Sequence, residues 1–176
     1  MKLLKILGVG LVLLIAVYVI LCIVGPKSMN TERSVTINAP AEEVFALVSD
    51  YNQWMNWSPW QKNDPSMKPV IAGNPGTIGH KMSWQSESQG NGEQSISDII
   101  PNQKVTSALK FDGWDGISYA TFNITPEGAG TKVTWDMKGD DVAFMFRGLM
   151  LVMGGADMIG KDYENGLASI KEICEK

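Results

Sequence analysis

The chain has 176 residues, 44% of them hydrophobic, and its 19 acidic residues outnumber its 15 basic ones, which gives a formal net charge of −4. This length suits one domain of ordinary size together with a membrane segment. No run of basic residues occurs, so the composition argues against a nucleic-acid partner. The two cysteines, Cys22 and Cys174, lie far apart and predict no disulfide framework.

Residues 1–26 predict a membrane anchor. No charged residue occurs from Ile6 to Val24, a run of 19 residues. At about 1.5 Å rise per residue, such a helix nearly spans the hydrocarbon layer of a bilayer, which is about 30 Å thick. A cleaved signal peptide is the alternative, but its apolar region is usually only about 7–15 residues long. Lipoprotein cleavage at Cys22 is a further alternative, although Leu21 is unfavourable before a modified cysteine.

The charges that flank this run favour a single-pass protein with residues 27–176 on the extracytoplasmic side. Lys2 and Lys5 precede the run, whereas Lys27 and Arg33 follow it, so the bias is small. Without Lys2 and Lys5, residues 27–176 keep 13 basic residues against 19 acidic ones, a net charge of −6. A domain this acidic is not expected to lie flat on anionic lipid by electrostatics alone.

Residues 31–60 predict one strand followed by two short helices. Val35 and Ile37 alternate with polar residues between Thr31 and Asn38, as in a half-buried strand. Pro40 suits the first position of a helix over residues 40–49, because proline is well placed at that position. A second short helix follows from Asp50, and Pro59 ends it.

Over residues 67–138 the apolar residues recur at every second position, as in the strands of an antiparallel sheet. Gly-, Asn- and Pro-rich turns separate runs of strand length, which predicts a meander of about six strands. Several runs alternate between an apolar face, called the covered face below, and a face with lysines and threonines. The predicted covered face contains His80, Met82, Trp84, Ile96, Asp98, Ile100, Val105, Leu109, Phe111, Ala120, Phe122, Ile124, Val133, Trp135 and Met137.

The last segment predicts two helical halves separated by Gly154-Gly155, because a glycine pair favours a break or kink in a helix. The second half is amphipathic, and its apolar face carries Ile159, Tyr163, Leu167, Ile170 and Cys174. The first half, residues 142–153, is apolar nearly all round, with Arg147 its only charge. Such a helix must be covered by protein, ligand or lipid, and the sheet is the predicted partner. The order of elements predicts an α+β fold.

The chain resembles the START/polyketide cyclase superfamily, also called SRPBCC proteins. Three segments carry the resemblance: ERSVTINAPAEEVFALVSDYNQWMNWSPW at 32–60, GTKVTWDMKGD at 130–140 and IGKDYENGLASIKEICE at 159–175. The resemblance covers about residues 31–175. It implies a helix-grip fold, in which a curved antiparallel sheet of about seven strands wraps a long C-terminal helix around a deep cavity. Members bind lipids, sterols, quinones or polyketides, and some are cyclases or chaperone activators, so the fold alone implies no activity.

Few residues suggest catalysis, and no catalytic, metal or cofactor site is predicted. His80 is the single histidine, and we expect a hydrogen-bonded structural role at a strand end rather than a triad. Asp98 either faces the cavity, where its pKa would be raised, or pairs with a lysine or Arg147. Arg147 either binds the acidic head of a ligand or reaches water. A metal site is not expected, because it would need clustered His, Cys or carboxylates.

Aromatic and methionine side chains are the stronger signal, because methionines suit a tolerant apolar pocket. Trp54 and Trp57 are expected to pack the short helices onto the sheet, whereas Trp60, Trp84, Trp114 and Trp135 are further candidates. The predicted ligand-binding residues are His80, Met82, Trp84, Asp98, Leu109, Tyr119, Phe122, Trp135, Met137, Phe146 and Met150.

Three hypotheses follow from these signals. The first is a membrane-anchored module that binds an apolar small molecule or lipid in the cavity. The second is a cyclase- or dehydratase-type enzyme that uses His80, Asp98 or Tyr119 as acid–base groups, which requires that the three converge. The third is a protein-interaction module that docks residues 142–153, which requires that this segment lie outside the fold as an exposed patch.

Overall fold

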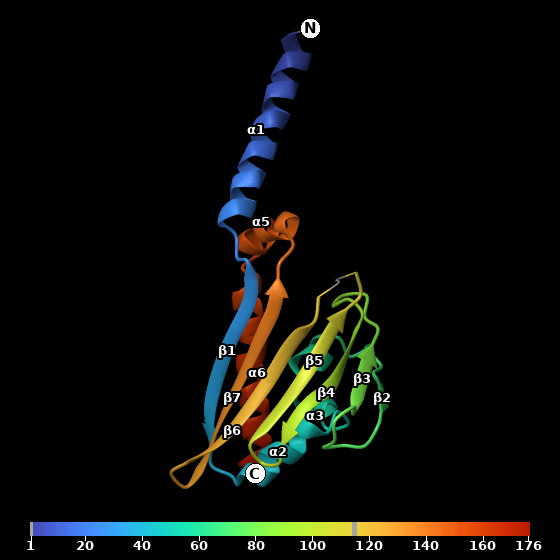
Figure 1. Ribbon diagram of the computed structural model, residues 1–176, viewed down its shortest axis with the longest axis vertical. Helices are drawn as coiled ribbons and strands as arrows, with labels where there is room; N and C mark the ends of the chain where they lie inside the picture. The colour runs from blue at the N-terminus through green and yellow to red at the C-terminus, as the bar shows by residue number, and fades with distance from the viewer. Residues whose placement is uncertain (1, 114–115) are drawn as a thin grey trace.

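The computed structural model describes residues 2–113 and 116–176. Trp114 and Asp115 lie outside the described residues. Helix α1 (Lys2–Val24) projects away from a sheet-and-helix domain, and the chain ends at the opposite extreme of the molecule (Figure 1). The segment Lys5–Val24 is long and apolar enough to cross a membrane, and its length, composition and N-terminal position also fit a signal sequence.

The domain contains one antiparallel sheet of seven strands, which confirms the predicted α+β fold. The strands are β1 (Ser28–Ile37), β2 (Val70–Ala72), β3 (Lys81–Trp84), β4 (Gly92–Ile100), β5 (Lys104–Phe111), β6 (Ser118–Glu127) and β7 (Gly130–Asp141). Their order is β1-β7-β6-β5-β4-β3-β2. Strands β2 to β7 therefore form a continuous meander, and β1 pairs with the last strand, β7. The strands β2 to β7 follow one another because short turns join neighbouring antiparallel strands.

Four helices cover one face of this sheet. They are α2 (Ala41–Ser49), α3 (Trp54–Trp57), α4 (Pro59–Asn63) and α6 (Gly155–Cys174). Pro59 occupies the first turn of α4, where its missing N–H costs nothing. Helix α6 lies along β1 and β7 (Figure 1), and its predicted apolar face is confirmed, since Tyr163, Leu167 and Ile170 are buried.

An aromatic cluster fills the space between the short helices, α6 and the sheet. It consists of Trp54, Trp57, Trp60, Phe122, Trp135 and Tyr163. Trp135 is stacked between Phe122, with ring centroids 4.5 Å apart, and Tyr163, with centroids 3.8 Å apart. Trp54 and Trp57 meet these rings edge to face, which is a favourable aromatic geometry. The expectation that Trp54 and Trp57 pack the short helices onto the sheet is confirmed.

Helix α5 (Phe144–Met153) does not cover the sheet, and this prediction was wrong. Gly154 has a left-handed φ of 63° and separates α5 from α6, so the predicted break is confirmed. The turn sends α5 across the end of the sheet, where it packs against the last turns of α1 (Figure 1). An apolar pattern requires a partner but does not identify it, and here the described partner is α1 rather than the sheet.

Candidate functional site

The covered face of the sheet is organised as rows of side chains that run across the strands. The first row contains Trp84, Gly92 and Phe111, at the end of the sheet nearest α1 and α5. The second row contains Met82, Gln94, Leu109 and Ser118. The third contains Ile96, Ser107, Ala120 and Met137, and the fourth contains Val105, Phe122 and Trp135. Side chains of one row are cross-strand neighbours about 5 Å apart and therefore act as one surface.

Burial increases from the first row to the fourth. Phe111 is 39% exposed and Trp84 is half-buried, whereas Trp135 in the fourth row is 1% exposed. The second and third rows are mostly apolar and are buried or half-buried. The covered face therefore leads from an open rim to the closed aromatic cluster. The predicted lining residues Met82, Trp84, Leu109, Phe122, Trp135 and Met137 all lie on this path.

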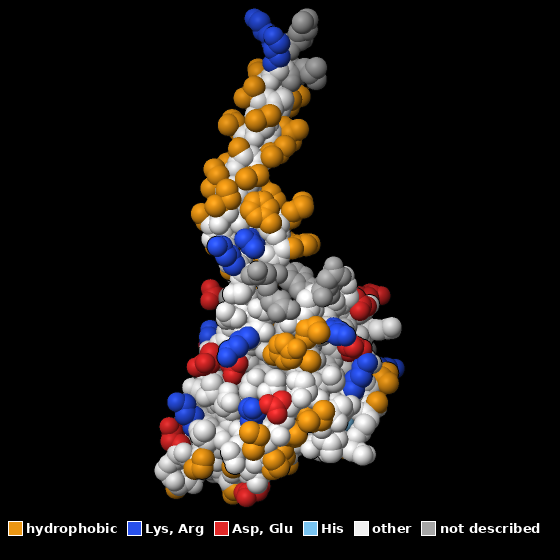
Figure 2. Space-filling view, viewed as in Figure 1, with side chains coloured by type: hydrophobic (Ala, Val, Ile, Leu, Met, Phe, Trp, Pro, Cys, Tyr) orange, Lys and Arg blue, Asp and Glu red, His pale blue; other side chains and the backbone are white. Residues whose placement is uncertain are grey.

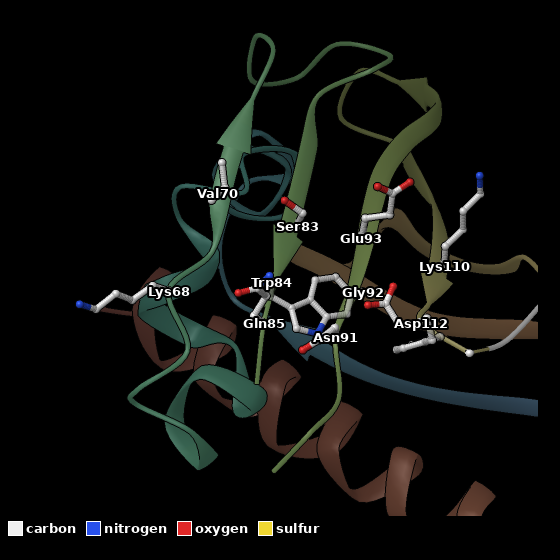
Figure 3. Close-up of a pocket in the computed structure, with 12 residues that line it drawn as sticks. Lys68, Val70, Ser83, Trp84, Gln85, Asn91, Gly92, Glu93, Lys110 and Asp112 are labelled. Atoms are coloured by element: carbon white, nitrogen blue, oxygen red, sulfur yellow. The ribbon is translucent and has the colours of Figure 1, made fainter. Parts of the chain in front are cut away.

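A pocket of about 640 Å³, called the rim pocket below, adjoins the first row. It is formed by β2 to β5 and by the loops after β3 and β5 (Figure 3). A Cβ at Gly92 would lie 2.7 Å from the Trp84 ring, so glycine is what lets the indole lie across β4. Charged side chains surround the aromatic pair of Trp84 and Phe111, and these are Lys68, Glu93, Lys110 and Asp112. Ser83, Glu93 and Lys110 alternate along the strands with Trp84, Gly92 and Phe111, so the rim pocket joins the apolar first row to polar side chains of the opposite face.

The fourth row ends the path because its rings already contact other rings. Phe122 and Trp135 face the covered side as predicted, but Trp54 and Trp57 occupy the space before them. The Trp135 Nε1 is buried without a hydrogen-bond partner among the described residues. A buried indole N–H normally finds an acceptor. This donor is therefore available to a polar atom that reaches the cluster.

His80 has the structural role expected from the sequence. Its side chain is fully buried in the loop before β3. The Tyr51 N–H donates to His80 Nε2 at 3.0 Å, and His80 Nδ1 lies 3.1 Å from the Ala72 carbonyl oxygen. Because Nε2 accepts a hydrogen bond, the proton belongs on Nδ1, which then donates to Ala72. His80 therefore joins α2–α3 to β2 and has both nitrogens engaged.

Asp98 does not face the covered side, and this placement was wrong. The register of β4 on β5 shifts between Ile96 and Asp98, which marks a β-bulge. The extra residue turns Asp98 to the outer face and brings Ile99 inward. Asp98 there forms an ion pair with Lys104 at 2.6 Å, and the hydrogen bond from Lys104 lowers the pKa of its carboxyl. This is the lysine pairing that the sequence left open.

The three predicted acid–base groups do not converge. Tyr119 is 44% exposed on the outer face of β6, where it pairs with Ala108 and Lys138 in the sheet register. Asp98 is on the outer face of β4, and His80 is buried beneath the sheet edge. Of these three candidates, none is positioned to exchange a proton with a molecule shared by the other two. Within the described residues, no group of three or more His, Cys, Asp or Glu side chains could hold a metal ion.

Phe146 and Met150, which were predicted to line the cavity, lie on α5 and therefore away from the sheet rows. Phe146 is 50% exposed, and Met150 contacts the start of α6 at Gly155. Arg147 on the same helix donates from Nε to the Val142 carbonyl at 2.9 Å. The guanidinium thus holds the chain just before α5 rather than projecting toward the rim pocket.

Several polar residues near the covered face were missed by the sequence analysis, among them Gln94 and Asp162. Gln94 is 3% exposed between Met82 and Leu109, and its alternation with Ile96 could have revealed it. Asp162 on α6 is half-buried near Trp60. Burial raises the pKa of the Asp162 carboxyl, while Trp60 opposes the shift. No sequence signal identifies Asp162, because it follows Lys161 on what looks like a solvated helix face.

Comparison with solved structures supports the same architecture. Protein CV1439 from Chromobacterium violaceum aligns with a TM-score of 0.62 and 14% identity over 84% of this chain and 98% of its own. A Thermobifida fusca protein gives 0.60 and 20% over 82% and 91%, and the Aha1 dimer from Colwellia psychrerythraea gives 0.58 and 17% over 83% and 96%. At these identities the similarity establishes the fold alone. A comparison with curated proteins gives no match.

A family model described as polyketide cyclase / dehydrase and lipid transport matches residues 28–175. This match covers the whole sheet and α6, including every row of the covered face and the rim pocket. The helix-grip architecture agrees with it, as does the resemblance seen in the three sequence segments. The chain therefore belongs to the polyketide cyclase / dehydrase and lipid transport family of the START-like SRPBCC superfamily.

Proposed function

We propose that the protein is a membrane-anchored START-like domain that binds a mostly apolar small molecule or lipid on the covered face of its sheet. The ligand enters at the rim pocket, lies over Met82, Leu109 and Met137, and meets the aromatic cluster at its inner end. The family includes proteins of lipid transport by its description, which supports this class of ligand. We also propose that residues 1–26 form the anchor and residues 27–176 the binding domain, on the extracytoplasmic side.

The observation that carries the proposal is the gradient of the rows. Apolar side chains continue without a charged residue from the half-buried Trp84 through Met82 and Leu109 to Met137. Burial of apolar surface contributes about 25 cal/mol per Å², which is enough to hold a lipid-sized molecule. The few polar groups along this path, Gln94, Ser107 and the Trp135 Nε1, can orient such a molecule.

Binding without turnover is favoured over catalysis because the candidate acid–base groups have separate partners. His80 bonds Tyr51 and Ala72, and Asp98 pairs with Lys104. General acid–base catalysis needs groups within hydrogen-bond reach of one reacting atom. Asp50 Oδ1 lies 3.5 Å from His80 Nε2, but that nitrogen already accepts from the Tyr51 N–H and His80 is fully buried. Asp162 is half-buried beside Trp60.

A titration tests this proposal. The full chain in lipid nanodiscs is mixed with a fluorescent fatty acid or a quinone, and quenching of tryptophan fluorescence is recorded. Trp84→Ala and Leu109→Ser should weaken saturable binding, because both side chains line the path inward from the rim. Tyr119→Ala is the matched control, since Tyr119 lies on the outer face of the same sheet. Equal affinity in all three variants, or the absence of saturable binding, would contradict the proposal.

A further inference from the structure

Helix α5 is joined to α1 by close contacts. The Tyr18 hydroxyl donates to the Met145 carbonyl, and the Cys22 thiol lies 3.8 Å from the same oxygen. A Cβ at Gly148 would lie 3.0 Å from Cys22 Sγ and 3.3 Å from the Cys22 nitrogen. Small residues at a crossing let two helix backbones approach closely, as they do between membrane helices. Helix α5 therefore packs closely against α1 at this crossing.

The second close approach lies at the end of α1. A Cβ at Gly25 would collide with the Arg147 carbonyl, so only glycine allows α5 to cross the chain there. Cys22 is fully buried by this crossing, although the rest of α1 is mostly exposed. The orientation of α5 relative to α1 is thus set by Gly25, Cys22 and Gly148 together.

The remaining surface of α5 is apolar and exposed. Met145 is 70% exposed, Val152 69% and Met153 58%, and Met158 near the start of α6 is 59% exposed. Such a surface is costly in water, because each Å² of apolar area contributes about 25 cal/mol when it is removed from water. Soluble proteins rarely leave a contiguous apolar patch of this kind uncovered unless something binds it.

Continuity with α1 identifies what covers this patch. The exposed apolar side chains of α1 run down to its last turn, where α5 begins (Figure 2). Basic side chains gather at the base of α1 in the same view, and Lys27 and Arg147 belong to this junction. Apolar surface on one side and basic groups at its border are the features of a helix that lies in the interface of a bilayer.

The depth of α5 along α1 agrees with a position in the interface of a bilayer. Tyr18 contacts α5 and precedes Val24 by six residues, which is about 9 Å along a helix. The Met145 carbonyl contacts both Tyr18 and Cys22, and Cys22 precedes Val24 by only two residues. If α1 crosses the bilayer with Val24 at the boundary of the hydrocarbon layer, Met145 lies roughly 3–9 Å below that boundary. Interfacial helices bury their apolar face by about 5–10 Å. The bilayer that holds α1 therefore reaches α5 as well.

We propose that α5 is a second membrane element, an interfacial helix whose partner is the lipid bilayer, and that it seats the domain on the membrane. This inference rests on the proposed membrane anchor. Because α5 and the first row of the covered face lie at the same end of the sheet, the seated helix holds the rim pocket next to the lipid surface. The sheet is fixed relative to the membrane by two elements rather than by one flexible tether.

Site-directed fluorescence tests the proposal in the full chain. Cys22→Ala and Cys174→Ala provide a background without thiols, and an NBD label is attached to one new cysteine at a time. The three positions are Val152→Cys on α5, Leu13→Cys on α1 and Glu172→Cys at the far end of α6. Each protein is placed in phosphatidylcholine/phosphatidylglycerol vesicles that contain lipids with a nitroxide near the headgroup or near the acyl terminus.

We expect loss of NBD fluorescence at Leu13 with the deep nitroxide, at Val152 with the shallow nitroxide, and at neither depth for Glu172. Quenching at Leu13 without quenching at Val152 would overturn the role of α5 while the anchor stands, and α5 would then face water or a protein. Absence of quenching at both positions would overturn the anchor and the inference together. A circular dichroism melt of each labelled protein verifies that it is folded. If the Val152→Cys protein is not folded, Met145→Cys replaces it as the labelled position on α5.

Discussion

Gly166 is the residue at which α6 comes closest to the aromatic cluster. A Cβ there would lie 2.8 Å from Trp135 Cζ3 and 3.3 Å from Pro59 Cδ. The Trp135 ring cannot move aside, because Phe122 and Tyr163 are stacked on its two faces. Gly166→Ala gains about 1 kcal/mol of helix propensity and loses about 1–3 kcal/mol by overpacking.

We therefore expect Gly166→Ala to lower the free energy of unfolding by about 1 kcal/mol, measured by urea denaturation of the full chain. Gly155→Ala is the matched control, because a Cβ there would meet nothing closer than Met150 Cγ at 3.7 Å. Equal stability of the two variants would show that α6 has room to move away from Trp135.

Cys174 is predicted to be an unreactive thiol. Burial near the end of α6, together with the charges of Glu43 and Glu175, raises the pKa of the Cys174 thiol to about 11. The thiolate is the reactive form, so at pH 8 the folded protein presents on the order of 100-fold less of it than an unfolded chain with an ordinary pKa. Alkylation of Cys174, followed by peptide mass spectrometry with and without urea, measures this ratio. Equal rates would place the thiol in water.

At the scale of elements, the sequence predicted correctly those features that follow from a regular spacing of apolar residues. Alternation every second residue identified the covered face, because opposite faces of a strand differ in burial. The alternation placed Asp98 on the wrong face of the sheet, because a bulge adds one residue and reverses the alternation. Neither Ser97 nor Asp98 is a residue type that indicates a bulge at this position. Phe122 and Trp135 were predicted to line the cavity, whereas their packing against Trp57 and Trp60 depends on elements that meet only in the fold.

Helix α5 shows the complementary limit. Its all-round apolar pattern predicted that something covers it, and Gly154 predicted where it separates from α6. The direction that the chain takes after a left-handed residue is a property of the backbone, and the contact with α1 depends on Gly25 and Gly148 in segments 123 residues apart. The partner of α5 could therefore not be predicted from residue types alone.

A disulfide between α1 and α5 tests their contact. A Cβ at residue 148 would lie 3.0 Å from Cys22 Sγ, which is close enough for a second sulfur to bond with it. We expect Gly148→Cys to form an intramolecular disulfide with Cys22 under mild oxidation, detected by peptide mass spectrometry. Met153→Cys at the exposed end of α5 is the control and should stay reduced. A free Gly148→Cys thiol after oxidation would separate α5 from α1.

At the scale of the whole molecule, the hydrophobic core lies in the sheet-and-helix domain, whereas α1 and α5 lie at one end of that domain. Helix α2 and the C-terminus lie at one end of the sheet, whereas α1 and α5 lie at the other end (Figure 1). Cys22 is the one described residue of α1 that is classed as buried, and the contact that buries it is with α5. We therefore expect the core of the domain to form without α1.

This separation predicts the behaviour of a fragment that contains residues 27–176. It should show mixed α/β circular dichroism and a cooperative melt, because Ile37, Trp135 and Ile170 keep all their contacts within the sheet, the short helices and α6. It should also self-associate, since loss of α1 uncovers the Gly148 side of α5 beside the exposed Met145 and Val152. Replacing Met145 and Val152 by Asp in the fragment should suppress this association, measured by sedimentation velocity, without changing the melt. A fragment that melts without cooperativity would make α1 part of the folded unit and move the domain boundary toward the N-terminus.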